Sequence, residues 1–317
     1  MEASGSAGNG ATNNGATNSS GGGGVAIHIM TEADVVRTLA WAGSEGWNPG
    51  NADAKPFQAA DPEGFFISKT EDGEPVASVS AVRYGEDYGF IGLYICAPEF
   101  RGRGHGLAVF RHGMDHLEGR VMGLDAVLEQ QANYAKLGFE VAHLTLRFEG
   151  VGGAVDAPPS LTPTAEGEQG GGLVVEKLGQ DNVELVLDFD RGHVPAPRAQ
   201  FMRTWFANPG HTTLVAMEKG SVRGYGVLRP SAGGARIGPL FADSVKVAEL
   251  LLMGLAGSTS PKTMISMDIP DINEEAVRLA ERLGFSKVFV MARMYRGPAP
   301  KVPMDRIFSI TIAELGP

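Results

Sequence analysis

The sequence predicts an α/β protein made of two tandem modules. Strand-like and helix-like segments alternate over residues 25–150 and do so again over residues 172–317. Between them, residues 151–171 are rich in Gly, Pro and Ala and have little hydrophobic periodicity, which is typical of a linker. The tripeptide Leu-Gly-Phe occurs once in each module, at residues 137–139 and 283–285. We therefore interpret the chain as an internal duplication.

The elements of the first module follow from local signals, after a low-complexity tail at residues 1–24 that buries too little apolar surface to become ordered. A helix is expected after Thr31, a capping residue followed by apolar residues at helical spacing. Apolar stretches on both sides of Glu71-Asp72-Gly73 predict an antiparallel hairpin. In chain order, we predict strand 26–30, helix 33–41, an irregular loop, strands 65–69, 75–84 and 90–96, a helix from Leu107, strand 122–127, a helix around Tyr134 and strand 141–148.

The second module starts at Leu173, and the same signals define its elements. Its last helix is predicted from an amphipathic run that ends in the second Leu-Gly-Phe. In chain order, we predict helix 181–188, strands 212–218, 224–230 and 236–241, helix 245–256, strand 263–269 and a helical segment at 273–285.

Composition excludes several classes of partner. The chain has 317 residues, of which 43% are hydrophobic and 20% charged, as in globular proteins of two domains. With a formal net charge of −10 it has no broad basic surface, and no nucleic-acid partner is expected. Its one cysteine, Cys96, excludes an intrachain disulfide and is expected to be buried rather than nucleophilic. Without a membrane-length apolar run or a targeting signal, we expect a cytoplasmic protein with no membrane partner.

A glycine-rich turn joins a predicted strand to a predicted helix. Residues 98–106 read Pro-Glu-Phe-Arg-Gly-Arg-Gly-His-Gly. Because Gly102, Gly104 and Gly106 lack Cβ atoms, the backbone can curl tightly and bring its N–H groups to a phosphate at the positive end of the helix. We therefore expect a phosphorylated cofactor at this turn.

The spacing in this turn narrows the choice of cofactor. A mononucleotide P-loop would end in Gly-Lys-Ser/Thr, whereas this turn ends in His105-Gly106-Leu107. A dinucleotide site would need Gly-x-Gly-x-x-Gly within a βαβ unit, and the glycines here give Gly-x-Gly-x-Gly. Residues 101–106 instead fit Arg/Gln-x-x-Gly-x-Gly/Ala, which resembles the pyrophosphate-binding loop of the GNAT acetyltransferase superfamily.

A second motif about thirty residues later strengthens this resemblance. Tyr134-Ala135-Lys136-Leu137-Gly138-Phe139 is similar to the closing motif of the GNAT fold. The ending Arg-Met-Tyr-Arg-Gly-Pro, residues 293–298, extends the resemblance to a tandem-GNAT group over residues 25–317. The resemblance implies two GNAT-like domains, 25–150 and 172–317, each with a mixed, mostly antiparallel central sheet flanked by helices.

This resemblance also implies an activity and a set of cofactor-binding residues. It implies direct transfer of an acetyl group from acetyl-CoA to a primary amine of a small molecule, within a ternary complex. Tyr134 would protonate the leaving thiolate, and backbone N–H groups near the end of the fourth strand would stabilise the carbonyl oxygen. The implied cofactor-binding residues are Ile95, Cys96, Arg101, Gly102, Arg103, Gly104, His105 and Gly106.

An amine acceptor also requires a base. An alkylammonium with a pKa of about 10.4 is almost fully protonated at pH 7, and deprotonation costs about 4.6 kcal/mol. The candidate bases are Glu86, Asp87, Glu129 and Asp53, and the sequence does not rank them. Asp53 lies in the loop that borders the acceptor in GNAT proteins, and Trp47 either stacks on the acceptor or anchors that loop. No metal site is expected, because His112 and His116 lack the glutamate of a zinc-binding helix.

The second module lacks the features of an acetyl-CoA site. Its equivalent turn, residues 237–244, has no Arg-x-x-Gly-x-Gly, and Asp243 places a negative charge where a pyrophosphate would lie. Ala280 replaces the tyrosine. We therefore expect a catalytically silent half that shapes the acceptor pocket. Two other functions stay open: a non-catalytic acyl-CoA-binding sensor or scaffold, and an acetyltransferase of protein N-termini or lysines.

Overall fold

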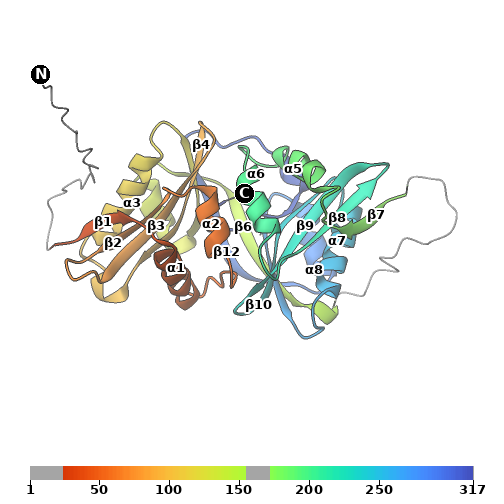
Figure 1. The fold of residues 1–317 in the computed structure, drawn as a ribbon, viewed down its shortest axis with the longest axis horizontal. Helices are drawn as coiled ribbons and strands as arrows, with labels where there is room; N and C mark the ends of the chain where they lie inside the picture. The colour runs from red at the N-terminus through yellow and green to blue at the C-terminus, as the bar shows by residue number, and fades with distance from the viewer. Residues whose placement is uncertain (1–23, 155–171, 317) are drawn as a thin grey trace, which may run out of the picture.

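The computed structural model describes residues 24–154 and 172–316 (Figure 1). Residues 1–23 of the predicted tail and residues 155–171 of the predicted linker lie outside this part of the chain. No helix within the described ranges is both long and apolar enough to cross a bilayer.

The first half alternates strands and helices much as the sequence predicts. The hairpin strands 65–69 and 75–84 are confirmed at their predicted bounds. The elements are β1 (Ala26–Ile29), α1 (Glu32–Ser44), α2 (Ala54–Ala60), β2 (Phe65–Lys69), β3 (Pro75–Tyr84), β4 (Tyr88–Cys96), α3 (His105–His116), β5 (Val121–Val127), α4 (Gln131–Ala135) and β6 (Glu140–Val151).

The second half has the same kinds of element. They are β7 (Val174–Lys177), α5 (Val183–Arg191), α6 (Ala199–Phe206), β8 (Thr212–Glu218), β9 (Ser221–Ser231), β10 (Gly234–Ala242), α7 (Val245–Gly257), β11 (Met264–Pro270), α8 (Glu274–Arg282), β12 (Ser286–Arg296) and β13 (Ile307–Ser309).

In the first half, the predicted start of α1 at Thr31 is confirmed. The Asp34 N–H donates to Thr31 Oγ1 at 3.2 Å, and the Thr31 N–H donates to Asp34 Oδ2 at 3.0 Å.

One sheet runs through both halves. Within the described residues its order is β1-β2-β3-β4-β5-β12-β6-β11-β10-β9-β8-β7, and β13 pairs with β10. Neighbours are antiparallel except for β4–β5 and β10–β11, which are parallel.

At the centre of the sheet the two halves exchange strands. β12 of the second half lies between β5 and β6 of the first half, and β6 also pairs with β11 of the second half. Figure 1 shows β6 and β12 in the middle of the molecule, where the two halves meet. Neither half therefore completes its sheet from its own residues.

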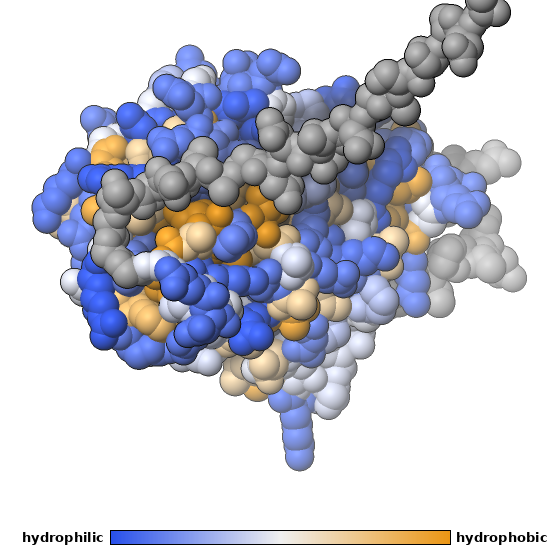
Figure 2. Space-filling model, turned by 60° about the vertical axis from the view of Figure 1, so that its left-hand side comes forward, coloured by the Kyte–Doolittle hydropathy of each residue, from blue (hydrophilic) through white to orange (hydrophobic). Residues whose placement is uncertain are grey.

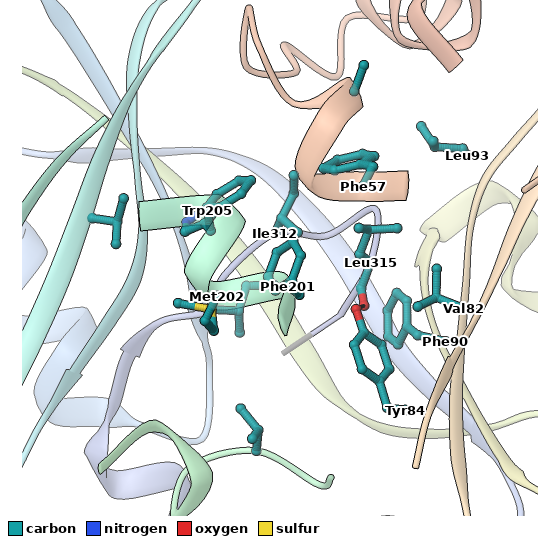
Figure 3. Close-up of a cluster of buried hydrophobic side chains, with 14 of the residues drawn as sticks. Phe57, Val82, Tyr84, Phe90, Leu93, Phe201, Met202, Trp205, Ile312 and Leu315 are labelled. Atoms are coloured by element: carbon teal, nitrogen blue, oxygen red, sulfur yellow. Dashed lines mark hydrogen bonds between the residues drawn. The ribbon is translucent and has the colours of Figure 1, made fainter. Parts of the chain in front are cut away.

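The halves also share a hydrophobic core. Phe57 and Phe90 of the first half belong to the same buried cluster as Trp205 of the second half. Ile312 and Leu315, near the end of the chain, lie between them in this cluster (Figure 3). The segment that follows β13 is thus part of the interface between the halves.

Some elements differ from the predictions. The loop expected around Asp53 contains α2, and α6 and β12 were not predicted. α2 and α6 have 7 and 8 residues, and helices this short depend on packing rather than on a periodic signal. The two pack against each other across the interface.

Candidate active site

A cavity of about 560 Å³ lies where β4 and β5 separate. These parallel strands pair from Tyr88↔Val121 to Ile91↔Leu124, and no pairing follows Ile91. Residues 91–96 of β4 line one wall, and Leu124, Asp125 and Val127 of β5 line another. Figure 2 shows apolar side chains gathered on a face of the first half, with hydrophilic residues around them.

A bulge in β4 shapes the first wall. The β3–β4 register shifts between Ser78 and Ser80, and Leu93 has a positive φ of 45°. The hydroxyl of Ser78 donates to the Leu93 carbonyl at 2.9 Å. Beyond the bulge, the Ala97 N–H donates to the Val76 carbonyl at 3.0 Å. Since N–H groups alternate between the two edges of a strand, the Cys96 N–H points to the open edge beside the cavity.

The glycine-rich turn borders the same cavity. Gly102 and Gly104 have φ values of 76° and 85°, and a Cβ at either position would meet no atom within 4 Å. Glycine is therefore required here for its backbone conformation rather than for space. Gly104 caps α3 without a side-chain hydrogen bond, so the first N–H groups of this helix have no capping side chain. This turn fits the pyrophosphate of a cofactor.

Gly106 is needed for a different reason. A Cβ at this buried position would lie 2.8 Å from the Tyr94 hydroxyl oxygen. Both residues line the cavity, and Tyr94 packs against Phe110 at a ring-centroid distance of 4.9 Å. The absence of a side chain at Gly106 thus lets α3 approach β4.

The structure separates the predicted cofactor-binding residues into two groups. Arg101 lines the cavity; its Nε donates to the Cys96 carbonyl at 2.8 Å, and its Nη2 pairs with Glu45 at 2.5 Å. Arg103 lies over the Phe100 ring at 5.8 Å, and neither Arg103 nor His105 lines the cavity. The predicted residues that do line it are Ile95, Cys96, Arg101, Gly102, Gly104 and Gly106.

Cys96 and Tyr134 both present protonated groups. Cys96 is half-buried rather than buried as predicted, and this partial burial raises the pKa of its thiol. Tyr134 lies in α4 and lines the cavity, with its ring 5.4 Å from Phe110 and 6.4 Å from Tyr94. Burial, with a smaller contribution from Tyr94, raises the pKa of Tyr134 well above its ordinary value. The phenol therefore keeps its proton at neutral pH.

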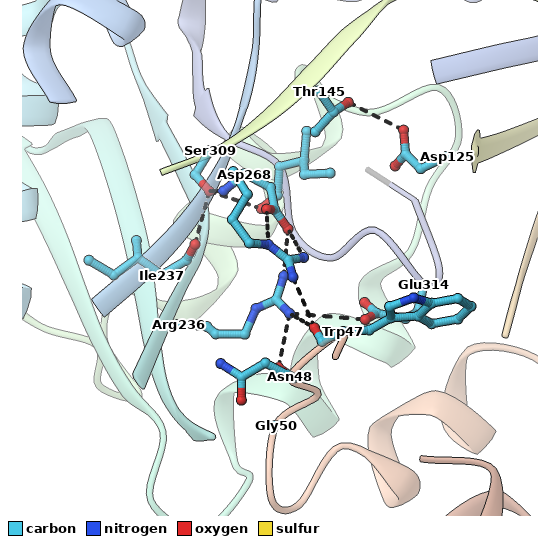
Figure 4. A network of polar contacts seen from close by, with 12 residues as sticks. Trp47, Asn48, Gly50, Asp125, Thr145, Arg236, Ile237, Asp268, Ser309 and Glu314 are labelled. Atoms are coloured by element: carbon cyan, nitrogen blue, oxygen red, sulfur yellow. Dashed lines mark hydrogen bonds and ion pairs between the residues drawn. The ribbon is translucent and has the colours of Figure 1, made fainter. Parts of the chain in front are cut away.

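The loop that carries Trp47 is held by β6 of the first half and by β10 of the second half. The Trp47 carbonyl accepts from Arg147 Nη1 at 3.0 Å and from Arg236 Nη1 at 2.9 Å (Figure 4). Both arginines pair with Asp268 on β11. Burial opposes ionisation of Asp268, but Arg147 and Arg236 outweigh it and hold the pKa of this carboxyl at about 2. Trp47, which lines the cavity, therefore lies on an anchored loop.

The predicted carboxylates occupy different places. Glu129 lies in a short 3-10 helix, Leu128–Gln130, at the exposed rim of the cavity. Glu86 and Asp87 lie in the exposed turn between β3 and β4, at the opposite end of β4 from Cys96. Glu86 is therefore too far from the cavity to act as the base, and this prediction is corrected.

Asp53 is a structural residue in this fold. It is fully buried, accepts from the Gly50 N–H at 2.8 Å and lies 3.4 Å from Arg229 Nε. It does not line the cavity. The predicted contact of Asp53 with the acceptor is corrected, because its carboxylate holds the loop before α2 against the second half.

Comparisons with known proteins agree with this site. The chain matches the Acetyltransferase (GNAT) family over residues 33–139 and an Acetyltransferase (GNAT) domain over residues 186–309. It is 33% identical over 277 residues to a holothin acyltransferase of Pseudoalteromonas sp. (strain SANK 73390), covering 87% of this chain and 89% of that one. The chain belongs to the GNAT family of acetyltransferases.

Solved structures of other GNAT proteins share its fold. A Pyrococcus horikoshii protein provisionally assigned as an acetyltransferase has a TM-score of 0.74 at 20% identity, covering 96% of this chain and all of that one. A tandem GNAT protein from the clavulanic acid biosynthesis pathway has a TM-score of 0.58 at 14% identity, covering 87% of this chain and 99% of that one. These structures confirm the predicted fold class, and the two family matches along the chain confirm the tandem-GNAT group.

In this GNAT protein the second half contributes residues to the cavity of the first. Phe289 and Met291 come from β12, and Ala313 and Glu314 come from the segment after β13. Sequence reasoning missed all four. No local motif marks them, since strand exchange and the return of the chain bring them to the cavity.

The equivalent turn of the second half differs from the glycine-rich turn as predicted. Asp243 accepts from Arg306 at 3.1 Å, and the Ser244 hydroxyl accepts from the Val247 N–H at 3.4 Å and so caps α7. This helix start is occupied by the protein's own groups, which disfavours a second acetyl-CoA site.

No metal centre is evident in the part of the chain that the structure describes, where no His, Cys, Asp or Glu residues form a group suited to a metal ion. His112 and His116 pack edge-on against Phe66 at 4.7 Å and 5.1 Å. His116 Nε2 lies 3.3 Å from Asp61 Oδ2.

Proposed function

We propose that the protein is an acetyl-CoA-dependent N-acetyltransferase that acts on a primary amine of a small molecule. The observation that supports this best is the meeting of the uncapped start of α3, the open edge of β4 and the Tyr134 phenol at one cavity. A pyrophosphate-binding turn, an amide that can polarise a carbonyl and a proton donor are the three groups that thioester transfer needs.

Each group has a separate task in this proposal. The N–H groups at the start of α3 bind the diphosphate, and the Cys96 N–H binds the thioester carbonyl oxygen as negative charge develops on it. Tyr134 donates its proton to the leaving sulfur. The raised pKa keeps this phenol protonated over the neutral range, so that it can hydrogen-bond to the leaving sulfur.

A small acceptor fits the cavity better than a peptide. Its volume of about 560 Å³ must hold the acetylated end of the cofactor as well as the acceptor. Trp47, Phe289 and Met291 give the acceptor side apolar walls. Because the relative of 33% identity is a holothin acyltransferase, holothin is the first acceptor to test.

Acceptor-dependent thiol release tests this function. Purified protein is incubated with acetyl-CoA and a panel of small amines including holothin, while free thiol is followed and products are detected by mass shift. We expect thiol release that depends on at least one amine, together with a product heavier by one acetyl group.

Other outcomes would favour the other functions. Binding of acetyl-CoA without thiol release for any amine would indicate a sensor or scaffold. Acetylation of peptides but not of small amines would indicate a protein acetyltransferase.

A further inference from the structure

We propose that Glu314, in the segment after β13, is the general base of acetyl transfer. The proposal rests on the proposed function and adds a catalytic residue from the second half to a cofactor site formed by the first. Glu314 lines the cavity, and only 4% of its surface is exposed. Its Oε2 has no hydrogen-bond partner among the described residues.

The other acidic residues that line the cavity do not combine these properties. Both oxygens of Asp125 are taken by Arg293, at 2.8 Å and 2.7 Å. Glu45 pairs with Arg101 of the glycine-rich turn, and Glu129 is exposed at the rim. Glu314 alone among them presents a buried carboxylate oxygen that has no hydrogen-bond partner among the described residues.

The backbone around Glu314 is held firmly against the first half. The Ser80 hydroxyl donates to the Glu314 carbonyl at 3.3 Å, and the Tyr84 hydroxyl donates to the Leu315 carbonyl at 2.9 Å. A side-chain carbon at Gly92 would collide with the Glu314 carbonyl oxygen. Glycine at this position of β4 therefore admits the segment into the gap between β4 and β5.

Buried polar groups of the second half fix the other end of the segment. Arg198 pairs with Asp190 at 2.7 Å and donates from Nη1 to the Thr311 hydroxyl at 2.7 Å. The Ile310 N–H donates to the Asp268 carbonyl at 2.9 Å. These contacts position Glu314 before any acceptor binds, as a catalytic group requires.

The guanidinium of Arg236 lies near one oxygen of the Glu314 carboxylate and leaves the other without a partner. Arg236 Nη1 is 4.0 Å from Glu314 Oε1 and also donates to the Trp47 and Asn48 carbonyls (Figure 4). Arg147, on the same carbonyl of Trp47, is paired with Asp268. Arg236 thus partly offsets the negative charge of the Glu314 carboxylate, while Oε2 has no hydrogen-bond partner.

Acetyl transfer in this proposal forms one carbon–nitrogen bond and breaks one carbon–sulfur bond. The acceptor nitrogen forms a bond to the thioester carbonyl carbon, and the carbon–sulfur bond breaks with its electron pair going to sulfur. Glu314 takes one proton from the acceptor ammonium, which gives the neutral amine that attacks. After the attack the nitrogen loses its second proton to water, and the sulfur takes the Tyr134 proton. The products are the N-acetylated amine and free coenzyme A, and the two residues regain their starting states by exchange with water.

Removing the base should cost about 10²- to 10⁴-fold in turnover at neutral pH. We expect Glu314→Gln to show this loss in kcat/KM for an alkyl amine at pH 7, with an unchanged Kd for acetyl-CoA in calorimetry. The loss should shrink as the pH is raised toward the pKa of the amine, because the solution then supplies deprotonated acceptor. A merely structural role would give the same loss at every pH.

Three companion variants complete the experiment. Glu118→Gln, an exposed carboxylate outside the cavity, should leave the rate unchanged. Glu129→Gln examines the competing candidate base. Glu314→Asp retains a carboxylate and should restore part of the rate, and thermal melts identify any variant that does not fold.

The outcomes separate this proposal from the proposed function. If the wild-type protein acetylates an amine and Glu314→Gln does so equally well, or with a loss that pH does not change, Glu314 is not the base. A pH-dependent loss in Glu129→Gln alone would assign the role to that residue. Absence of turnover in the wild-type protein with every amine would overturn the proposed function itself.

Discussion

At the scale of single residues, burial keeps the Tyr134 phenol protonated. Tyr134 keeps its proton because its ring lies among Phe110, Tyr94 and Phe139, where a phenolate would lack solvation. The position of a tyrosine in the motif indicates where it lies, but not how far its hydroxyl is shielded from solvent and how far its pKa is therefore raised.

Tyr134→Phe tests the proton donor. This change removes the hydroxyl but keeps the ring, so we expect kcat to fall by about 10²-fold while the Kd for acetyl-CoA stays within about twofold. Stopped-flow or steady-state thiol release gives the rate, and calorimetry gives the affinity. Equal losses in both quantities would contradict the donor role. Tyr88→Phe serves as a control, because the buried Tyr88 hydroxyl has no hydrogen-bond partner among the described residues and Tyr88 does not line the cavity.

At the scale of elements, the strand-to-helix turn at the start of α3 is the part of the site most accessible to prediction. Its glycines, its helix and the preceding strand are contiguous in sequence, and their spacing alone indicates an anion site. The acceptor side could not be predicted in this way. Phe289 and Met291 reach the cavity only because β12 pairs with β5, and this long-range pairing leaves no local signal.

Gly104→Ala tests the backbone of the turn. Because φ is 85° at Gly104, a Cβ there costs about 1–2 kcal/mol, and relief of this strain would displace the first N–H groups of α3. We expect acetyl-CoA affinity to fall by about tenfold in calorimetry. Gly257→Ala is the matched control, since a Cβ there meets no atom within 4 Å and the position has no positive φ. An unchanged affinity in Gly104→Ala would exclude this turn as the diphosphate site.

At the scale of the whole molecule, the exchange of β6 and β12 makes one body of two halves. Phe57 and Phe90 also pack in the same core cluster as Trp205, so the stability of each half includes surface buried by the other. The sequence predicts the duplication from the repeated Leu-Gly-Phe. It does not predict the exchange, because the pairing of β12 with β5 and β6 joins segments far apart in the sequence and leaves no local signal.

Unfolding should accordingly be a single cooperative transition. Trp41 and Trp47 report on the first half and Trp205 on the second. In guanidinium titrations of two variants, Trp205→Phe and the double variant Trp41→Phe/Trp47→Phe, fluorescence and circular dichroism should give coincident midpoints within each variant. Two separated transitions in either variant would show that the halves unfold independently.

The strand exchange has a consequence for synthesis on the ribosome. The open edge of β5 acquires its neighbour only after Ser286–Arg296 has been translated, and Glu314 follows later still. A nascent chain that already carries the complete glycine-rich turn and Tyr134 would still lack one wall of the cavity. Acetyl transfer would then become possible only after the second half has been translated and has packed against the first.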